Sequence, residues 1–171
     1  NPAYHRNTTA PEILRDFGDK DLNYFVSGWG TGGTITGVGE VLKAARPNIK
    51  IIGAEPETAS LLSGKEWQPH KIQGWTPDFV PKVLDPQHID QIVTVNEDVS
   101  IETAKELASK EGIFCGISAG ATMQAALQIA HDAPDNSTFC VMLPDTGERY
   151  FSSPLFADIN EDSDDEWLAT Q

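Results

Sequence analysis

The sequence predicts an α/β fold in which a mostly parallel, twisted sheet carries helices on both faces. Along the 171 residues, short apolar runs typical of buried strands alternate with longer segments whose apolar residues recur every three or four positions. Two glycine-rich turns, over 30–34 and 116–121, each follow an apolar run directly. This alternation favours parallel pairing, because each helix returns the chain to the starting edge of the sheet.

The first part of the chain supplies two of the predicted strands. A Thr-Ala-Pro-Glu sequence typical of a capping box predicts a helix over 9–17. An apolar run predicts a strand over 22–27, and the first glycine turn leads into a helix over 34–45. A second strand is expected over 50–54.

Residues 56–87 form the least regular segment. Five prolines interrupt it, and neither a helical nor a strand period runs through it. Connections of this length are often lids or binding loops, so we expect a functional loop here. A strand follows over 89–95. Ser100 is expected to cap the next helix, with Leu107 on its buried face and Glu106 on its exposed face.

Two further strands are predicted in the last third of the chain. Ile113 and Phe114 are expected to form a short buried strand. The second glycine turn then leads into a helix over 121–131, and 139–143 is expected to be the last strand. Because ligands bind at the carboxyl ends of parallel strands, we expect both glycine turns to face one crevice.

The composition disfavours two classes of partner. The net charge is −14, opposite to the positive surface with which proteins neutralise nucleic-acid phosphates. We recognise no signal peptide and no apolar run of the roughly 18 residues that a membrane span requires. We therefore expect no nucleic acid and no membrane as partner. Six acidic residues near the end predict a solvated tail over 157–171.

Cysteine and histidine show no disulfide or metal-ligand spacing. Cys115 and Cys140 each lie in an apolar run, where a cysteine usually behaves as a small buried hydrophobe. The four histidines are scattered, so no metal site is expected. Since no disulfide is expected, the predicted location is the reducing cytoplasm.

The first glycine turn, Gly30–Thr34, predicts a phosphate site. A strand, a glycine-rich turn and a helix together present bare backbone N–H groups and a helix N-terminus to an anion. A Walker A loop is excluded because no lysine follows Gly33. A dinucleotide fingerprint remains open, since Gly28, Gly30 and Gly33 fit its spacing and Glu55 follows the next strand. A tight turn without any ligand also remains open.

In the second turn, Ser118 stands at the start of a predicted helix. Its hydroxyl can cap the helix or face a ligand. The string Gly116–Gly120 also matches the G-x-S-x-G elbow of serine hydrolases. That mechanism needs an acid and then a histidine later in the chain. Only His131 follows, on the same helix and with no acid between, which disfavours a hydrolase.

Several segments together carry a resemblance to a known family, and they run in the family's order over nearly the whole chain. They are Asn1-Pro2-Ala3, Thr8-Thr9 with Pro11-Glu12-Ile13, Gly30-Thr31-Gly32-Gly33-Thr34 with Thr36-Gly37-Val38, Glu55-Pro56, His70-Lys71-Ile72-Gln73-Gly74, Gly116-Ile117-Ser118-Ala119-Gly120-Ala121 and Leu143-Pro144-Asp145-Thr146-Gly147-Glu148-Arg149-Tyr150. The chain resembles the C-terminal half of cysteine synthase (O-acetylserine sulfhydrylase), a fold-type II pyridoxal-phosphate enzyme with the tryptophan synthase β-like fold. Residues 1–156 would then form the cofactor-binding domain.

The resemblance implies a role for each turn. The first turn would hold the phosphate of pyridoxal 5′-phosphate, and Ser118 would hydrogen-bond its pyridine nitrogen. A neutral hydroxyl there would leave that nitrogen largely unprotonated. Gly74 would line the substrate side, and Pro144 and Asp145 would lie near the nitrogen edge of the ring. The implied cofactor contacts are Gly30, Thr31, Gly32, Gly33, Thr34 and Ser118.

The implied reaction is β-replacement, in which acetate leaves O-acetylserine and sulfide takes its place to give L-cysteine. A cystathionine β-synthase-like enzyme and a non-catalytic binding module remain alternatives. The family also implies a homodimer and docking of the C-terminal tail of serine acetyltransferase.

One departure from the family is large. The Schiff-base lysine and the asparagine loop that grips the substrate carboxylate belong to the family's N-terminal half, and neither motif occurs here. Lys71 matches a different family position. We therefore expect no catalytic residue in this chain, an incomplete fold, and an activity that belongs to a parent protein. Trp75 also departs from the family pattern, which leaves the accepted nucleophile open.

Overall fold

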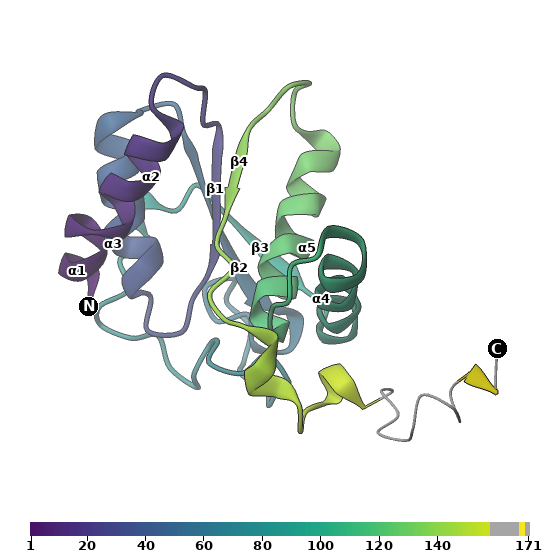
Figure 1. The fold of residues 1–171 in the computed structure, drawn as a ribbon. Helices are drawn as coiled ribbons and strands as arrows, with labels where there is room; N and C mark the ends of the chain where they lie inside the picture. Colours follow the sequence, from purple (N-terminus) through teal and green to yellow (C-terminus); the bar gives the residue numbers. More distant parts are fainter. Residues whose placement is uncertain (158–167, 170–171) are drawn as a thin grey trace.

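The computed structural model describes residues 1–157 and 168–169, and a parallel sheet lies at its centre (Figure 1). Its strands are β1 (Tyr24–Gly28), β2 (Lys50–Pro56), β3 (Gln91–Val95) and β4 (Phe139–Val141). Within the described residues their order is β3-β2-β1-β4, and each neighbouring pair is parallel. The predicted fold class is confirmed.

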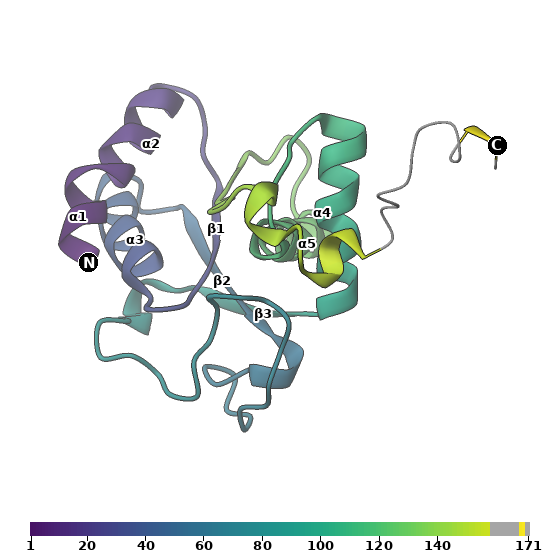
Figure 2. The ribbon, with the colours of Figure 1, turned by 60° about the horizontal axis from the view of Figure 1, so that its bottom comes forward.

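Helices cover both faces of the sheet, as Figures 1 and 2 show. The helices α1 (Pro2–Asn7), α2 (Thr9–Phe17) and α3 (Gly33–Ala45) lie on one face. The helices α4 (Glu97–Glu111) and α5 (Ile117–Asp132) lie on the other.

Strands β1, β2 and β4 contribute to two hydrophobic cores, because successive side chains point to opposite faces of a sheet. Phe25 and Ile51 belong to the core under α2 and α3, whereas Val26 and Ile52 belong to the core under α4 and α5. All four side chains are almost fully buried. The continuous apolar runs of these strands are what a sheet covered on both faces requires.

The long segment between β2 and β3 is irregular, as predicted, apart from short 3₁₀ turns at Glu57–Ala59 and Pro86–His88. Glu55 is fully buried near the end of β2 and binds the first part of this loop to the sheet. Its carboxylate accepts hydrogen bonds from the backbone N–H groups of Leu62 at 3.1 Å and Ser63 at 2.9 Å. A buried carboxylate needs such partners, so the loop is tied to the sheet here.

The N-terminal region differs from the prediction in two ways. The helix α1 was not predicted, and the expected capping box does not form, since α2 has Thr8 as N-cap and no side-chain cap. The reason is that α1 ends directly before α2, and the hydroxyls of Thr8 and Thr9 hydrogen-bond to residues of α1 instead of capping α2. Thr8 Oγ1 donates to the Tyr4 carbonyl at 2.9 Å, and Thr9 Oγ1 lies 3.0 Å from Nδ1 of His5.

The prediction that Ser100 caps the helix after β3 is wrong. Asn96 is the N-cap, and its side-chain oxygen accepts from the N–H groups of Asp98 at 3.0 Å and Val99 at 3.2 Å. Ser100 lies inside α4, fully buried, and donates to Oε1 of Gln124 on α5 at 2.8 Å. This serine therefore joins two helices.

The predicted buried strand at Ile113 and Phe114 is also wrong, because these side chains are 40% and 42% exposed. The short connection from α4 to α5 passes outside the sheet, and only Cys115 forms an isolated antiparallel bridge, with Thr146. Phe114 packs instead against the ring of Phe156, with centroids 5.6 Å apart.

Three further points concern the last third of the chain. The helix α5 begins at Ile117 rather than at 121, so the second glycine turn forms its first turn. Cys115 is buried as expected, whereas Cys140 is only half-buried. Most of the acidic tail, 158–167, lies outside the described residues.

Among the described helices, none has the length and apolar character needed to cross a membrane.

Candidate functional site

A cavity of about 370 Å³ lies at the carboxyl ends of β1 and β4, where a parallel sheet is expected to bind its ligand. Both glycine turns reach it, as does the long loop. Of the predicted site residues, Gly32 and Gly33 are buried and do not line the wall. The lining residues are Ser27, Gly28, Gly30, Thr31, Thr34, Gln73, Gly74, Trp75, Ser118, Thr122, Met142, Pro144, Asp145 and Tyr150.

The first glycine turn leads directly into α3, as predicted. Its N-cap, Gly32, has a left-handed φ of 82°, and no side chain caps the helix. The N–H of Gly33 reaches the Thr31 hydroxyl only at 3.4 Å. A helix start without a side-chain cap keeps backbone donors available, and the helix dipole favours an anion beside them.

Two residues of the N-terminal region reach this turn, and sequence reasoning missed both. The side-chain amide of Asn1 donates to Thr31 Oγ1 at 2.7 Å, and Nε2 of His5 lies 3.2 Å from Thr34 Oγ1. Burial lowers the pKa of His5. Only the packing of α1 on α3 creates these contacts, so no local sequence signal marks them.

The Gln73–Gly74 turn of the long loop rests on the first glycine turn. The Gly74 carbonyl lies so close to Gly30 that a side chain at Gly30 would overlap it. Next to it, the N–H of Thr76 donates to the Trp29 carbonyl at 2.9 Å. The turn that was predicted to face the substrate and the turn that was predicted to hold the phosphate therefore form one continuous wall.

At the other end of the cavity, Ser118 meets an acid and a phenol. Ser118 Oγ donates to Oδ1 of Asp145 at 3.0 Å, and the Tyr150 hydroxyl donates to Oδ2 of the same carboxylate. Burial, together with the hydrogen bond to Asp145 and its charge, raises the pKa of Tyr150 to about 12. Tyr150 is thus a fixed donor. Its role was not predicted, although it ends the Gly147–Tyr150 motif.

No lysine is among the residues that line the cavity. Lys71 lies outside it, where its ammonium donates to Asp98 Oδ1 at 2.8 Å. This hydrogen bond and the Asp98 charge raise the pKa of Lys71, which opposes a nucleophilic role. Trp75 does line the cavity, and its ring lies directly against the backbone of Gly28.

The position of Glu55 disfavours a dinucleotide-binding function for the first glycine turn. That function requires the carboxylate after the second strand to face a ribose. Glu55 is fully buried, and its two oxygens bind the backbone of the long loop instead.

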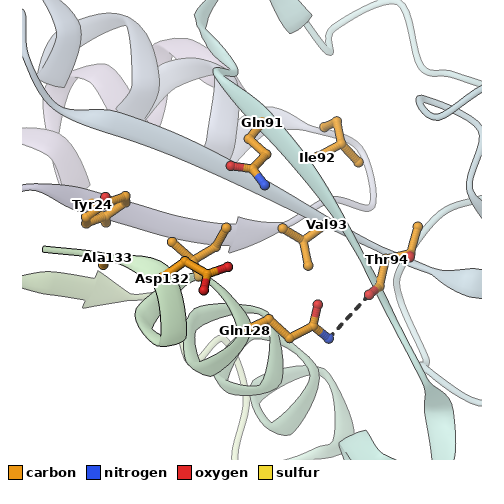
Figure 3. Close-up of a pocket in the computed structure, with 9 residues that line it drawn as sticks. Tyr24, Gln91, Ile92, Val93, Thr94, Gln128, Asp132 and Ala133 are labelled. Atoms are coloured by element: carbon orange, nitrogen blue, oxygen red, sulfur yellow. Dashed lines mark hydrogen bonds between the residues drawn. The ribbon is translucent and has the colours of Figure 1, made fainter.

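A second cavity, of about 490 Å³, lies at the opposite edge of the sheet, near the first residues of β1 and β3 and the end of α5 (Figure 3). Gln128 on α5 reaches the Thr94 carbonyl at 3.5 Å across it, and Asp132 is the charged side chain among its lining residues. None of the predicted site residues lines this cavity.

Comparison with known proteins identifies the family. The family model described as pyridoxal-phosphate-dependent enzyme matches residues 1–145. The chain belongs to this family, whose cofactor is pyridoxal phosphate. It is 54% identical over 170 residues to O-ureido-L-serine synthase of Streptomyces lavendulae, which covers 99% of this chain and 52% of the relative. It is 45% identical over 157 residues to cysteine synthase of Staphylococcus aureus, covering 92% and 51%.

Solved structures agree with this assignment. A crystal structure of O-ureido-L-serine synthase with O-ureido-L-serine bound has a TM-score of 0.95 and 54% identity, covering 99% of this chain and 53% of that one. O-acetyl serine sulfhydrylase isoform 3 from Entamoeba histolytica has a TM-score of 0.88 and 35% identity, covering 99% and 50%. The chain thus spans about half the length of the relatives that it matches.

The residues around the cavity suit the family's cofactor. Backbone donors at the start of α3 and the hydroxyl of Thr31 suit a phosphate, and close contact at Gly30 leaves backbone, not side chain, facing it. At the far end, Ser118 and Asp145 offer hydrogen-bonding groups to a ring nitrogen. The individual contacts, the homodimer, the acetyltransferase partner, the 1–156 domain boundary and the cytoplasmic location stay predictions.

Proposed function

We propose that this chain forms the cofactor-binding half of a pyridoxal-phosphate-dependent enzyme that exchanges the β-substituent of an O-activated L-serine. The observation that carries the proposal is the single cavity in which Thr31, Gly74 and Ser118 meet from three distant parts of the sequence. Membership of the family supplies the cofactor. When bound, pyridoxal phosphate withdraws electrons from the amino-acid α-carbon, which allows a β-leaving group to depart.

The chain's own residues bind and orient the cofactor and the substrate. Thr31, Thr34 and the first N–H groups of α3 would hold the phosphate, and Ser118 would hold the ring nitrogen. Gly74 would face the amino-acid substrate, because its turn forms the wall next to the phosphate turn. The apolar ring of Trp75 would limit access of water to that side.

For the second substrate we propose sulfide, which makes the product L-cysteine from O-acetyl-L-serine. The resemblance of the motifs to cysteine synthase and the relatives of that name support this choice. A second candidate is an N-hydroxyurea nucleophile that gives O-ureido-L-serine. The 54% identity to O-ureido-L-serine synthase over 99% of the chain favours it.

The lysine that the chemistry needs would come from outside this chain. We therefore expect the chain alone, with pyridoxal phosphate and O-acetyl-L-serine, to form no product with either sulfide or hydroxyurea. Adding the half of the Streptomyces lavendulae enzyme that this chain does not cover should restore turnover. Mass spectrometry distinguishes L-cysteine from O-ureido-L-serine. Product from the chain alone, or no product from an associated pair of halves, would contradict the proposal.

The cofactor site itself can be tested without the lysine. Pyridoxine 5′-phosphate has the same ring and phosphate but no aldehyde, so its affinity reports the non-covalent site only. Gly30→Ala should weaken its binding at least about tenfold, because the new methyl group displaces the Gly74 turn. Gly39→Ala, within the helix α3 that follows the turn, adds a methyl group with only ordinary contacts; it is the matched control and should bind like the wild type. Equal affinities for the two variants would place the site elsewhere.

A further inference from the structure

The Thr34 hydroxyl can bind a phosphate only if its hydrogen is free to point into the cavity. Thr34 stands in the first turn of α3 and lines the cavity. A hydroxyl has one O–H donor and two lone pairs, whereas the oxygens of an ionised phosphate accept hydrogen bonds. If a neighbouring group took the hydrogen, Thr34 would present lone pairs to the anion. The protein group that contacts Thr34 therefore decides whether this residue attracts or repels a phosphate.

That group is the ring of His5, on α1. Nε2 of His5 lies 3.2 Å from Thr34 Oγ1, and its other nitrogen, Nδ1, lies 3.0 Å from Thr9 Oγ1. A neutral imidazole carries hydrogen on one nitrogen and accepts at the other. Burial lowers the pKa of His5, which favours this neutral ring. The hydrogen bond that Nδ1 makes therefore fixes the role of Nε2 toward Thr34.

The hydroxyls between α1 and α2 indicate which nitrogen carries the hydrogen. Thr8 Oγ1 donates to the Tyr4 carbonyl at 2.9 Å, so toward Thr9, at 3.5 Å, it can only accept. Among the described residues, Thr9 Oγ1 has no partner besides Thr8 and His5. Its hydrogen goes to Nδ1 of His5, because 3.5 Å is longer than an ordinary O–H···O bond. Nε2 then carries the ring hydrogen and donates it to Thr34 Oγ1.

Thr31, the other threonine of the phosphate turn, has a matching arrangement. The side-chain amide of Asn1 donates to Thr31 Oγ1 at 2.7 Å, and the N–H of Gly33 reaches the same oxygen at 3.4 Å. Both lone pairs of Thr31 are thus occupied, and within the described part of the chain its hydrogen has no acceptor. The N-terminal region therefore leaves the hydrogens of both threonines available to a ligand in the cavity.

We propose that His5 is a positioning residue whose Nε2–H donates to Thr34 Oγ1 and so makes the Thr34 hydroxyl a hydrogen-bond donor to the cofactor's phosphate. This inference rests on the proposed function, because it assumes that the phosphate lies at the first glycine turn. From Thr9 through His5 to Thr34, each group then donates toward the cavity, and such a chain polarises in one direction. Its last hydrogen bond is charge-assisted, since the acceptor is an anion.

The position of the ring hydrogen can be measured in the full chain, because ¹⁵N chemical shifts distinguish a ring nitrogen with hydrogen from one without. With pyridoxine 5′-phosphate bound, we expect hydrogen on Nε2 of His5. His70 is the internal reference, since its Nε2 lies 3.2 Å from the Thr76 carbonyl, which can only accept. His5→Gln identifies the His5 signals by their loss. A hydrogen on Nδ1 alone would overturn the inference.

The affinity for pyridoxine 5′-phosphate gives a second measurement. His5→Leu removes the donor and should weaken binding about tenfold, as expected for a lost hydrogen bond that supports an anion. His5→Gln, whose amide can donate from the place of Nε2, should stay within about threefold of the wild type. His88→Leu is the matched control, because it removes a half-buried histidine that packs on α3 beside Gly39, away from the turn. It should bind like the wild type.

A double-mutant cycle separates an effect through Thr34 from a general loss of packing. In a Thr34→Val background no hydroxyl remains to be oriented, so His5→Leu should weaken binding by less than about twofold. A loss of about tenfold in both backgrounds, or wild-type affinity in His5→Leu, would overturn the inference alone. No binding of pyridoxine 5′-phosphate to the wild type would instead overturn the proposed cofactor site.

Discussion

Asp145 illustrates how single contacts define this site. Its two oxygens accept from Ser118 and Tyr150, and its carboxylate rests on Gly116. These residues come from the turn before α5, from its first turn and from the segment after β4. One carboxylate therefore fixes the position of three segments at the end of the cavity.

The Tyr150–Asp145 pair predicts how stability depends on alkaline pH. Burial is the largest cause that raises the pKa of Tyr150 to about 12, above its usual value near 10. A group with a raised pKa in the fold stabilises it fully below the unfolded pKa and loses this contribution as pH rises through the folded one. The free energy of unfolding should therefore fall between about pH 10 and about pH 12.

Urea unfolding at several pH values measures this slope. Tyr150→Phe should be less stable at neutral pH by about 1–3 kcal/mol and should show a flatter alkaline decline. Tyr4→Phe changes a tyrosine that is 68% exposed and should keep the wild-type slope. An identical alkaline slope in Tyr150→Phe would contradict the assigned contact.

Ser118 and Gly30–Thr34 were predicted as site residues because each stands in a local pattern, a glycine-rich turn between a strand and a helix, and of these Gly30, Thr31, Thr34 and Ser118 line the cavity. Sequence reasoning missed Asn1 and His5, which reach the phosphate turn only through the packing of α1 on α3. Nothing in the neighbouring sequence of Asn1 or His5 encodes a contact made about 30 residues away. Local sequence patterns therefore do not reveal those site residues that reach the site from a distant helix or strand.

At the scale of elements, one buried acid, Glu55, holds the start of the long loop between β2 and β3. Glu55→Ala would leave the N–H groups of Leu62 and Ser63 without their acceptor. We expect a loss of about 2–4 kcal/mol in the free energy of unfolding, measured by urea denaturation. Glu57→Ala, an exposed acid two residues later, should cost less than about 0.5 kcal/mol. Equal losses would show that Glu55 does not hold the loop.

The strands and most helices were predictable because helices cover both faces of the sheet. This burial requires continuous apolar runs in the strands and one apolar face on each helix. Helix starts were less predictable. Helix α4 begins at Glu97, with Asn96 and not Ser100 as its N-cap. Asparagine and serine are both favoured as N-caps, and the buried Ser100 hydroxyl lies instead within hydrogen-bonding distance of the Asn96 carbonyl and of Gln124 Oε1. The segment at Ile113 and Phe114 has the composition of a strand, yet it is too short to reach the sheet between two helices that pack together.

At the scale of the whole molecule, the formal net charge of −14 lowers the stability of the folded state. Excess charge of one sign destabilises a compact state through self-repulsion. Raising NaCl from about 0.01 M to about 0.15 M shortens the Debye length from about 30 Å to about 8 Å. The melting temperature at neutral pH should then rise by about 2–4 °C, corresponding to about 1 kcal/mol.

The same salt series near pH 4.4, the isoelectric point of the sequence, is the control. There the net repulsion vanishes, so salt should have little effect or should weaken attractive pairs such as Lys43–Asp90. A melting temperature that falls with salt at neutral pH would mean that attractive ion pairs outweigh the net charge.

The pairing of β4 with β1 also has a consequence for the order of events when the chain is made. Asn23 accepts a hydrogen bond from Thr138, 115 residues later, and β4 adds to the edge of a sheet whose other strands are synthesised first. Contacts so distant in sequence form late, because closing a long loop is entropically costly. During translation, the phosphate turn and α3 leave the ribosome long before Asp145 and Tyr150. A nascent chain would therefore assemble the phosphate end of the cavity first and complete the ring-nitrogen end only after almost all of the described chain has emerged.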